Sequence, residues 1–167
     1  MYTSEIRKKS KVLIVYATTS GNSEMVAEAI ADGINQSDHA IEAECVRAEV
    51  TKPSELNKFS ASILIASTWN VGLLNDNMVP FNKDLLSMKM DGKLIDVVGL
   101  GDSKNYDIYN GAADILENTV KKVGASQVMP TLKIDGEVFS RLEEYKAWGK
   151  IYAEKLVKKL SSNTLSE

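Results

Sequence analysis

The sequence predicts an α/β fold in which a five-stranded parallel sheet is covered by helices on both faces. Short apolar runs alternate with amphipathic stretches, which is the pattern of a doubly wound three-layer sandwich. Two of the runs, "VLIVY" and "SILIAS", lack the period-two alternation of a half-exposed strand, so we expect them to be buried on both sides. The predicted strands span residues 11–16, 41–46, 62–67, 94–100 and 126–132.

Four amphipathic segments are predicted to be helices because their apolar residues recur at helical spacing. Pro80 suits the first turn of the second helix, and Gly124 lies at the position where a glycine commonly ends a helix, here the third. Trp148 falls on the apolar side of the last helix and is therefore predicted to be a core residue. The helices are expected around residues 26–34, 79–88, 112–123 and 142–160.

Length and composition indicate one soluble domain. The chain has 167 residues, of which 44% are hydrophobic and 26% charged, and its formal net charge is −3. This mild acidity gives no reason to expect nucleic-acid binding, and no apolar run approaches the roughly 18 residues of a membrane span, so we expect a cytoplasmic protein. One cysteine and one histidine leave no internal disulfide and few metal arrangements. We expect a domain at 11–160, a flexible extension at 1–10 and a tail at 161–167.

The loops after the first, third and fourth strands should meet at one edge of the sheet, where doubly wound folds bind ligands. The first loop, "ATTSGNS" at 17–23, places hydroxyl groups and a glycine at the start of a helix, which is a natural phosphate site. It contains no Lys or Arg and lacks the ending of a Walker loop. The alternative is a hydroxyl-rich turn in which Ser23 is the helix N-cap.

The second and third loops carry aromatic side chains. Trp69 follows a buried strand in "STWNVGLLNDN", where its face would suit a flat ring, since stacking contributes about 0.5–1.5 kcal/mol beyond burial. The alternative is an indole packed on the next helix. The third loop, "GLGDSKNYDIYNGAAD", offers glycines for close backbone approach, the Asp102 carboxylate, and a tyrosine at 106 or 109. The alternative there is a turn followed by a helix capped near Asn110.

In order and spacing, "TTSGNS", "STW" and "GLGDS…Y…GAAD" resemble the three motifs of flavodoxins. The similarity covers about residues 10 to 160, and the missing insertion in the fifth strand resembles the short-chain kind. The resemblance implies the flavodoxin-like strand order 2-1-3-4-5 and non-covalently bound FMN. It further implies a monomeric, low-potential one-electron carrier that works between a reductase of the ferredoxin/flavodoxin-NADP type and acceptor enzymes.

The resemblance also assigns residues to the FMN. Trp69 would lie against one face of the flavin ring and Tyr106 against the other, with Tyr109 as the reserve because "GDSKNY" shifts the tyrosine by one residue. Asp102 would accept a hydrogen bond from the ring near N3, and Asn70 would turn its carbonyl toward N5. Backbone groups near the ring would come from Ser67, Thr68, Gly101 and Ser103. Donors to the 5′-phosphate would be Thr18, Thr19, Ser20, Gly21, Asn22 and Ser23.

Two departures from the family pattern lead to expectations of their own. The family usually has glycine where this chain has Asn70, and a positive φ costs asparagine more than glycine. We therefore expect weaker stabilisation of the half-reduced flavin than in a glycine-bearing relative. The tryptophan loop has only Asp76 as an acidic residue and the third loop contains Lys104, so we expect a smaller electrostatic contribution to the potential.

Other functions stay open at this point. An FMN-dependent quinone or NAD(P)H oxidoreductase of the flavodoxin-like superfamily is the main alternative, but it needs an open ring face that two aromatic side chains would cover. A flavin-free receiver module has a similar strand order and needs an acidic pair after the first strand, which "VYATTSGN" lacks. A family member kept only for protein contacts is the third possibility.

Overall fold

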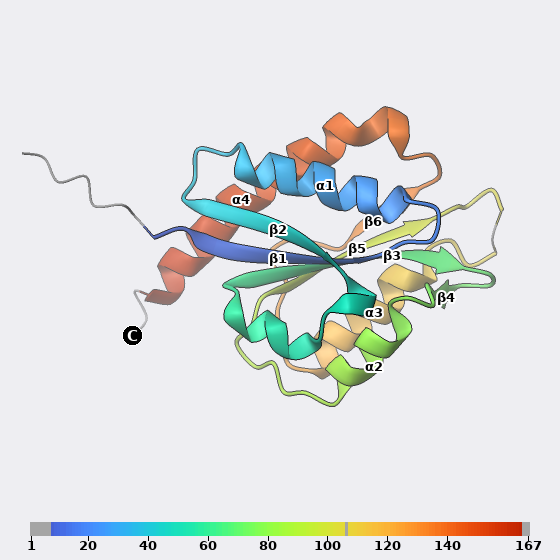
Figure 1. The fold of residues 1–167 in the computed structure, drawn as a ribbon, viewed down its shortest axis with the longest axis horizontal. Coiled ribbons are helices and arrows are strands. Elements are labelled where there is room, and N and C mark those ends of the chain that lie inside the picture. The colour runs from blue at the N-terminus through green and yellow to red at the C-terminus, as the bar shows by residue number, and fades with distance from the viewer. Residues whose placement is uncertain (1–7, 106, 165–167) are drawn as a thin grey trace, which may run out of the picture.

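The computed structural model describes residues 8–105 and 107–164, and it confirms the predicted doubly wound α/β fold (Figure 1). Five parallel strands lie in the order β2-β1-β3-β5-β6, which is the predicted order 2-1-3-4-5 when the parallel strands alone are counted. The short strand β4 pairs antiparallel with the end of β3 and was not predicted. The strands are β1 (Ser10–Ala17), β2 (Ile41–Arg47), β3 (Ala61–Trp69), β4 (Leu73–Leu74), β5 (Ile95–Gly101) and β6 (Leu132–Asp135).

Helices cover both faces of the sheet, with α1 and α4 on one side and α2 and α3 on the other (Figure 1). Pro80 lies in the first turn of α2, and Gly124 follows α3 with a φ of 85°, as predicted. The helices are α1 (Asn22–Asn35), α2 (Val79–Leu86), α3 (Gly111–Lys122) and α4 (Leu142–Thr164), with 3₁₀ turns η1 (Ala48–Val50), η2 (Pro53–Lys58) and η3 (Phe139–Arg141).

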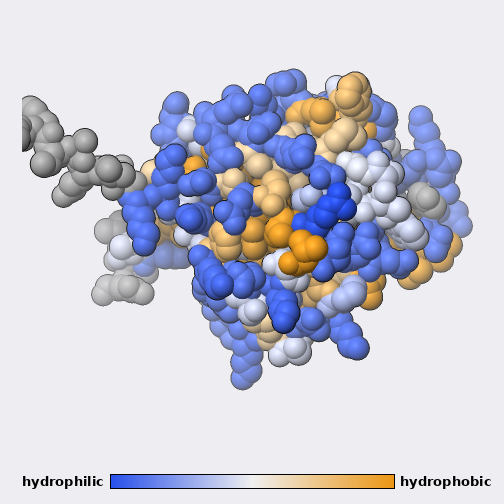
Figure 2. Space-filling model, viewed as in Figure 1, coloured by the Kyte–Doolittle hydropathy of each residue, from blue (hydrophilic) through white to orange (hydrophobic). Residues whose placement is uncertain are grey.

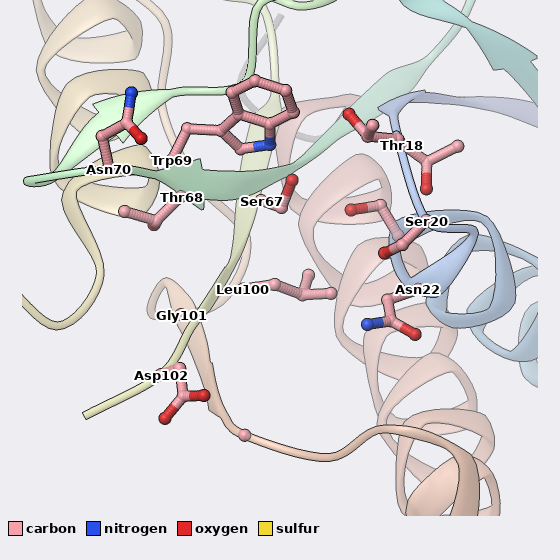
Figure 3. Close-up of a pocket in the computed structure, with 13 residues that line it drawn as sticks. Thr18, Ser20, Asn22, Ser67, Thr68, Trp69, Asn70, Leu100, Gly101 and Asp102 are labelled. Atoms are coloured by element: carbon pink, nitrogen blue, oxygen red, sulfur yellow. The ribbon is translucent and has the colours of Figure 1, made fainter. Parts of the chain in front are cut away.

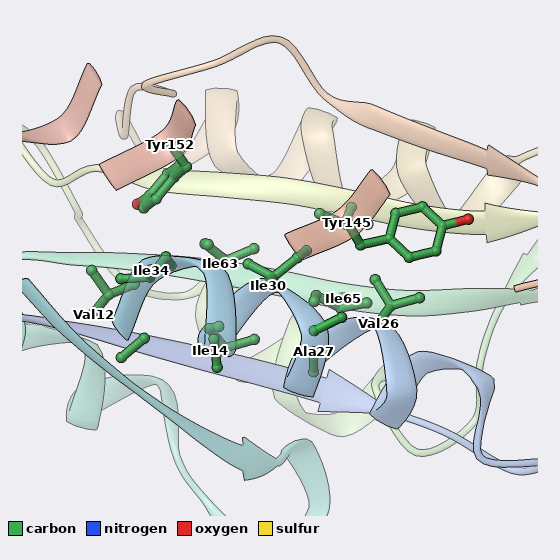
Figure 4. Close-up of a cluster of buried hydrophobic side chains, with 14 of the residues drawn as sticks. Val12, Ile14, Val26, Ala27, Ile30, Ile34, Ile63, Ile65, Tyr145 and Tyr152 are labelled. Atoms are coloured by element: carbon green, nitrogen blue, oxygen red, sulfur yellow. The ribbon is translucent and has the colours of Figure 1, made fainter. Parts of the chain in front are cut away.

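The core has two halves because the sheet is buried on both faces. In β1, Ile14 packs in the cluster beneath α1 and α4, and its neighbour Val15 packs in the cluster beneath α2 and α3 (Figure 4 shows the first). This explains why the β1 sequence shows no alternation of polar and apolar residues. Trp148, predicted to be a core residue, is partly buried, packs against the first cluster and stacks on Tyr152 at a ring separation of 5.5 Å.

The prediction of a strand at residues 126–132 is wrong, because the regular strand β6 begins only at Leu132. The backbone N–H groups of Val128 and Met129 donate to the two carboxylate oxygens of Asp96, both at 2.8 Å. These donors are then not available to a strand ladder, and Pro130 has no N–H to offer. The buried Asp96 side chain thus explains why the regular strand begins further along the chain. Strand β6 pairs with the end of β5 that lies nearest the predicted site.

The ends of the domain differ slightly from the predicted ones. Strand β1 begins at Ser10, and α4 continues through Thr164, so the first residues of the segment predicted as a tail are helical. The hydroxyl of Thr164 donates to the Leu160 carbonyl at 2.9 Å within this last turn. The predicted flexible extension falls largely on residues 1–7, which lie outside the described residues. No helix in the described chain is long and apolar enough to cross a membrane.

Candidate functional site

The carboxyl ends of β1, β3 and β5 meet at one edge of the sheet and line a pocket of about 290 Å³ (Figure 3). The pocket lies beside the switch point between β1 and β3, where the direction of strand order reverses. Most of the predicted contact residues line it. The lining residues are Thr18, Thr19, Ser20, Asn22, Ser23, Ser67, Thr68, Trp69, Asn70, Leu100, Gly101, Asp102 and Gly136.

The first loop ends in a helix without a side-chain cap. Gly21, with a φ of 93°, is the N-cap of α1, and its N–H donates to the Thr18 hydroxyl at 2.8 Å. The hypothesis that Ser23 caps the helix is therefore wrong. Its hydroxyl is buried beside the pocket and has no hydrogen-bond partner among the described residues. The first N–H groups of α1 and the positive end of its dipole thus face a region lined by hydroxyl groups.

The second loop is a tight hairpin from β3 to β4 that starts at Trp69. The indole ring lines the pocket, and in Figure 3 it lies between Asn70 and the first loop, so it is not packed away on the next helix. Asn70 has a φ of 48°, the one positive value at a non-glycine residue in the described chain. The positive φ that sequence analysis connected with this position is therefore present, and Gly72 follows with a φ of 84°.

The third loop begins at Gly101, where the backbone passes close to another segment. A Cβ atom at Gly101 would lie 1.9 Å from the carbonyl oxygen of Tyr109, so only glycine fits without a shift of the backbone. Beyond it, the Asp102 side chain accepts hydrogen bonds from the backbone N–H of Lys104 at 3.0 Å and from Asn105. Asp102 lines the pocket while its carboxylate also orders its own turn.

Among the described residues with a predicted contact, Gly21, Ser103 and Tyr109 do not line the pocket. The N–H and hydroxyl of Ser103 donate to the Asp135 carboxylate at 2.8 and 2.6 Å, and these bonds lower the pKa of Asp135. Tyr109 precedes Asn110, which caps α3 by accepting from the Ala113 N–H at 3.3 Å, as the alternative interpretation of this loop expected. Tyr106 lies outside the described residues, so the choice between the tyrosines stays a prediction.

Sequence analysis missed several residues of this edge. Leu100 and Gly136 line the pocket, and Asp135 anchors the third loop, although β6 was not among the strands whose ends were considered. Asn75 and Asn77 connect the second loop to the first. The two asparagines of "LLNDN" were the sequence feature that could have indicated this connection, since asparagine amides that become buried have to form hydrogen bonds.

Hydroxyl donors at an uncapped helix start, with an aromatic residue and a glycine at the neighbouring strand ends, define a protein that binds an aromatic mononucleotide at the switch point of a doubly wound sheet. Comparisons with known proteins agree. The flavodoxin family profile matches residues 14–148. A flavodoxin of Maridesulfovibrio salexigens is 33% identical over 149 residues, which cover 88% of this chain and 99% of the relative.

Solved structures give the same result. The oxidised flavodoxin 1 of Bacillus cereus superposes with a TM-score of 0.76 at 30% identity, covering 89% of this chain and 98% of its own. A short-chain flavodoxin associated with a PDU bacterial microcompartment has a TM-score of 0.78 at 28% identity, covering 90% and 98%. The chain belongs to the flavodoxin family. Flavodoxins bind FMN, and the chain is an electron-transfer protein rather than an enzyme.

Proposed function

We propose that the chain holds FMN in the pocket at the carboxyl edge of its sheet and works as a low-potential carrier of single electrons. When bound, FMN supplies the redox chemistry, because its ring takes up and releases electrons one at a time. The protein binds and orients the cofactor through neutral groups of the first loop. The proposed phosphate donors are the hydroxyls of Thr18, Thr19, Ser20 and Ser23 and the backbone N–H groups of Asn22 and Ser23.

The buried hydroxyl of Ser23 is the observation that supports this proposal most strongly. Ser23 is one of the residues that line the pocket, and its hydroxyl oxygen is buried with no partner among the described residues. A buried polar group left unpaired costs about 1–3 kcal/mol, so the fold gains when a ligand supplies the partner. A phosphate oxygen fits this position, because the uncapped start of α1 favours an anion at the same place. None of the described residues that line the pocket is basic, so neutral donors carry the recognition.

The ring is proposed to lie beside Trp69, with Asn70 and Gly101 presenting backbone groups to its edge. Two of the predicted donor groups already form hydrogen bonds within the protein. The Gly21 N–H already donates to the Thr18 hydroxyl at 2.8 Å. The Thr68 hydroxyl accepts from the Ala112 N–H at 3.1 Å and keeps its proton. The N–H and hydroxyl of Ser103 are taken by Asp135. Tyr106 remains the side chain proposed to cover the second face of the ring, and Tyr109 is the other candidate. Asp102 remains the proposed acceptor of a hydrogen bond from the ring near N3.

The carboxylates of Asp102 and Asp135 support a low potential, and the positive charges of Lys104 and Arg141 near Asp135 reduce their effect. Asp102 lines the pocket, and Asp135 holds the neighbouring loop through Ser103. Sequence analysis counted only Asp76 in the tryptophan loop and did not include Asp135. A negative charge near the ring opposes the addition of electrons to the bound flavin, and so it lowers the potential.

The proposed partners are a reductase of the ferredoxin/flavodoxin-NADP type and acceptor enzymes, and we propose a cytoplasmic monomer. Exposed apolar side chains next to the site support transient protein contacts. Val71 is 67% exposed and Leu73 53% exposed in the β4 hairpin, and the side chain of Ile108 lies against Gly72. Figure 2 shows apolar residues at the end of the molecule that carries this hairpin.

Titration of the flavin-free protein with FMN and with riboflavin tests the proposal. We expect one FMN per chain and much weaker binding of riboflavin, which lacks the phosphate. Ser23→Ala should weaken FMN binding about tenfold and leave riboflavin binding unchanged, since one hydrogen bond to a charged group contributes roughly 1.4 kcal/mol. The matched control is Ser37→Ala at the opposite end of α1, where the hydroxyl donates to the Ile34 carbonyl. Failure of the wild type to bind FMN would contradict the proposal.

A further inference from the structure

A buried asparagine lies behind the proposed phosphate site. Asn75 follows β4, is 0% exposed and does not line the pocket, but it contacts two residues that do. Its Nδ2 lies 3.1 Å from the Thr19 hydroxyl and 2.8 Å from the Ser67 hydroxyl. One side-chain amide therefore joins the first loop to the end of β3.

The orientation of this amide is fixed by its other bonds. Its Oδ1 accepts from the backbone N–H of Asn77 at 2.9 Å. A backbone N–H is only a donor, so the amide oxygen has to face Asn77 and the NH₂ group has to face the two hydroxyls. The backbone of the same residue is also held, because the Asn75 N–H donates to the Ser67 carbonyl at 3.1 Å.

This orientation decides what the two hydroxyls do. A hydroxyl has one proton to donate and two lone pairs that accept. The hydroxyls of Thr19 and Ser67 accept from Asn75, and neither donates to a protein acceptor among the described residues. Each therefore keeps its proton for a group outside the protein, and both residues line the pocket.

We propose that Asn75 is a positioning residue that sets the hydroxyls of Thr19 and Ser67 as donors to the FMN phosphate, an inference that rests on the proposed function above. The described lining of the pocket contains no Lys or Arg, so the direction of neutral hydrogen bonds decides whether the site attracts or repels an anion. Asn77 supports the arrangement from the second loop, since its side-chain amide donates to the Thr18 carbonyl at 3.0 Å.

Replacement by aspartate separates this role from simple tethering of the two loops. An aspartate at 75 has the same size and accepts from Asn77 as before. It also accepts from both hydroxyls, so the loops stay connected. The hydroxyl protons now point away from the pocket toward the new carboxylate, and a negative charge lies behind the anion.

The experiment compares dissociation constants for FMN and riboflavin in Asn75→Asp, in Asn75→Ala and in the wild type. With two donors lost at about tenfold each, Asn75→Asp should raise the constant for FMN about 100-fold. The constant for riboflavin should change less than about threefold, because riboflavin makes no phosphate contact. Asn82→Asp is the matched control, since Asn82 lies outside the pocket and accepts from the Thr119 hydroxyl at 2.7 Å, a bond that aspartate keeps.

Equal loss of FMN and riboflavin binding in Asn75→Asp would overturn the inference and show a purely structural residue. If this variant does not fold, as judged by circular dichroism, Asn75→Ala decides. A loss selective for FMN supports the inference, and an unchanged ratio of the two constants overturns it. A wild type that binds riboflavin as tightly as FMN would instead refute the proposed phosphate site itself.

Discussion

The two halves of the proposed flavin site are held in place by different means. The phosphate half comprises residues 18–23 with Asn75 behind them. Side-chain hydrogen bonds from the buried amide of Asn75 and the partly buried amide of Asn77 fix it. The ring half comprises, among the described residues, 69–72, 101–105 and 107–109. Backbone conformation fixes this half, through the positive φ of Asn70 and the close approach at Gly101.

The difference corresponds to what each half has to do. Recognition of a phosphate without basic residues needs donors that are already oriented, and buried amides orient them at no cost on binding. The ring half lies on exposed loops, where the backbone itself meets the edge of the flavin and partner proteins can approach. Substitutions in the phosphate half should therefore change affinity for FMN alone, whereas those in the ring half should change affinity for FMN and riboflavin together.

The largest effect is expected at Gly101. An alanine Cβ would lie 1.9 Å from the Tyr109 carbonyl oxygen, so the backbone of the third loop has to move. We expect Gly101→Ala to lower the free energy of unfolding by about 3 kcal/mol, as overpacking does, and to weaken both flavins strongly. Urea unfolding and flavin titration measure this.

Gly21→Ala is the control for Gly101→Ala from the phosphate half. No atom lies within 4 Å of the added Cβ, and only the φ of 93° opposes the change. We expect a loss of about 1–2 kcal/mol from the left-handed conformation. Equal losses of stability in the two variants would contradict the account of the third loop.

Trp69→Ala should have the next largest effect. Loss of stacking and burial should weaken FMN and riboflavin about tenfold or more, by the same factor, since stacking alone contributes about 0.5–1.5 kcal/mol. Trp69→Phe keeps an aromatic face and should keep most of the affinity. Loss of FMN binding with riboflavin binding intact would instead place the indole in the phosphate half.

A smaller effect is expected at Asp135, where hydrogen bonds from Ser103 lower the pKa of the carboxyl group. A lowered pKa means that the ionised form stabilises the loop, so the stabilisation is complete above the ordinary value of 3.8 and is lost as pH falls through the lowered value. The NMR resonance of the Ser103 amide should shift in that acidic range. Asp135→Asn should abolish this titration and weaken both flavins a few-fold, whereas an unchanged titration would contradict the contact.

The smallest effect on stability is expected for Asn70→Gly. Glycine relieves the cost of a φ of 48° but loses more conformational entropy on folding, so the free energy of unfolding should change by less than about 1 kcal/mol. The two one-electron potentials of the bound flavin should separate further, because the peptide after Trp69 reorients more easily. A redox titration measures the two potentials, and potentials equal to those of the wild type would contradict the expected role of Asn70.

The features that the sequence predicted correctly are those that depend on residues close together in the chain. The runs "VLIVY" and "SILIAS" identify central strands because burial on both faces leaves no polar position. The small polar residues of the first loop likewise identify an anion site at a helix start. Strand order and the general place of the site follow from these features and from the family resemblance.

The failures came from contacts between residues distant in sequence. The last strand starts late because Asp96, 32 residues before Val128, captures the backbone donors of that segment. Asn75 was missed because its partner Thr19 lies 56 residues away. The N-cap was misplaced for a local reason, since Gly21 adopts the left-handed conformation and leaves the Ser23 hydroxyl free.

A potentiometric titration of the FMN-loaded wild type, followed by visible absorption, tests the central claim most directly. The account predicts two resolved one-electron steps at low potential and no oxidation of NADPH unless a reductase is added. A single two-electron step, or direct oxidation of NADPH by the protein alone, would contradict the role of one-electron carrier.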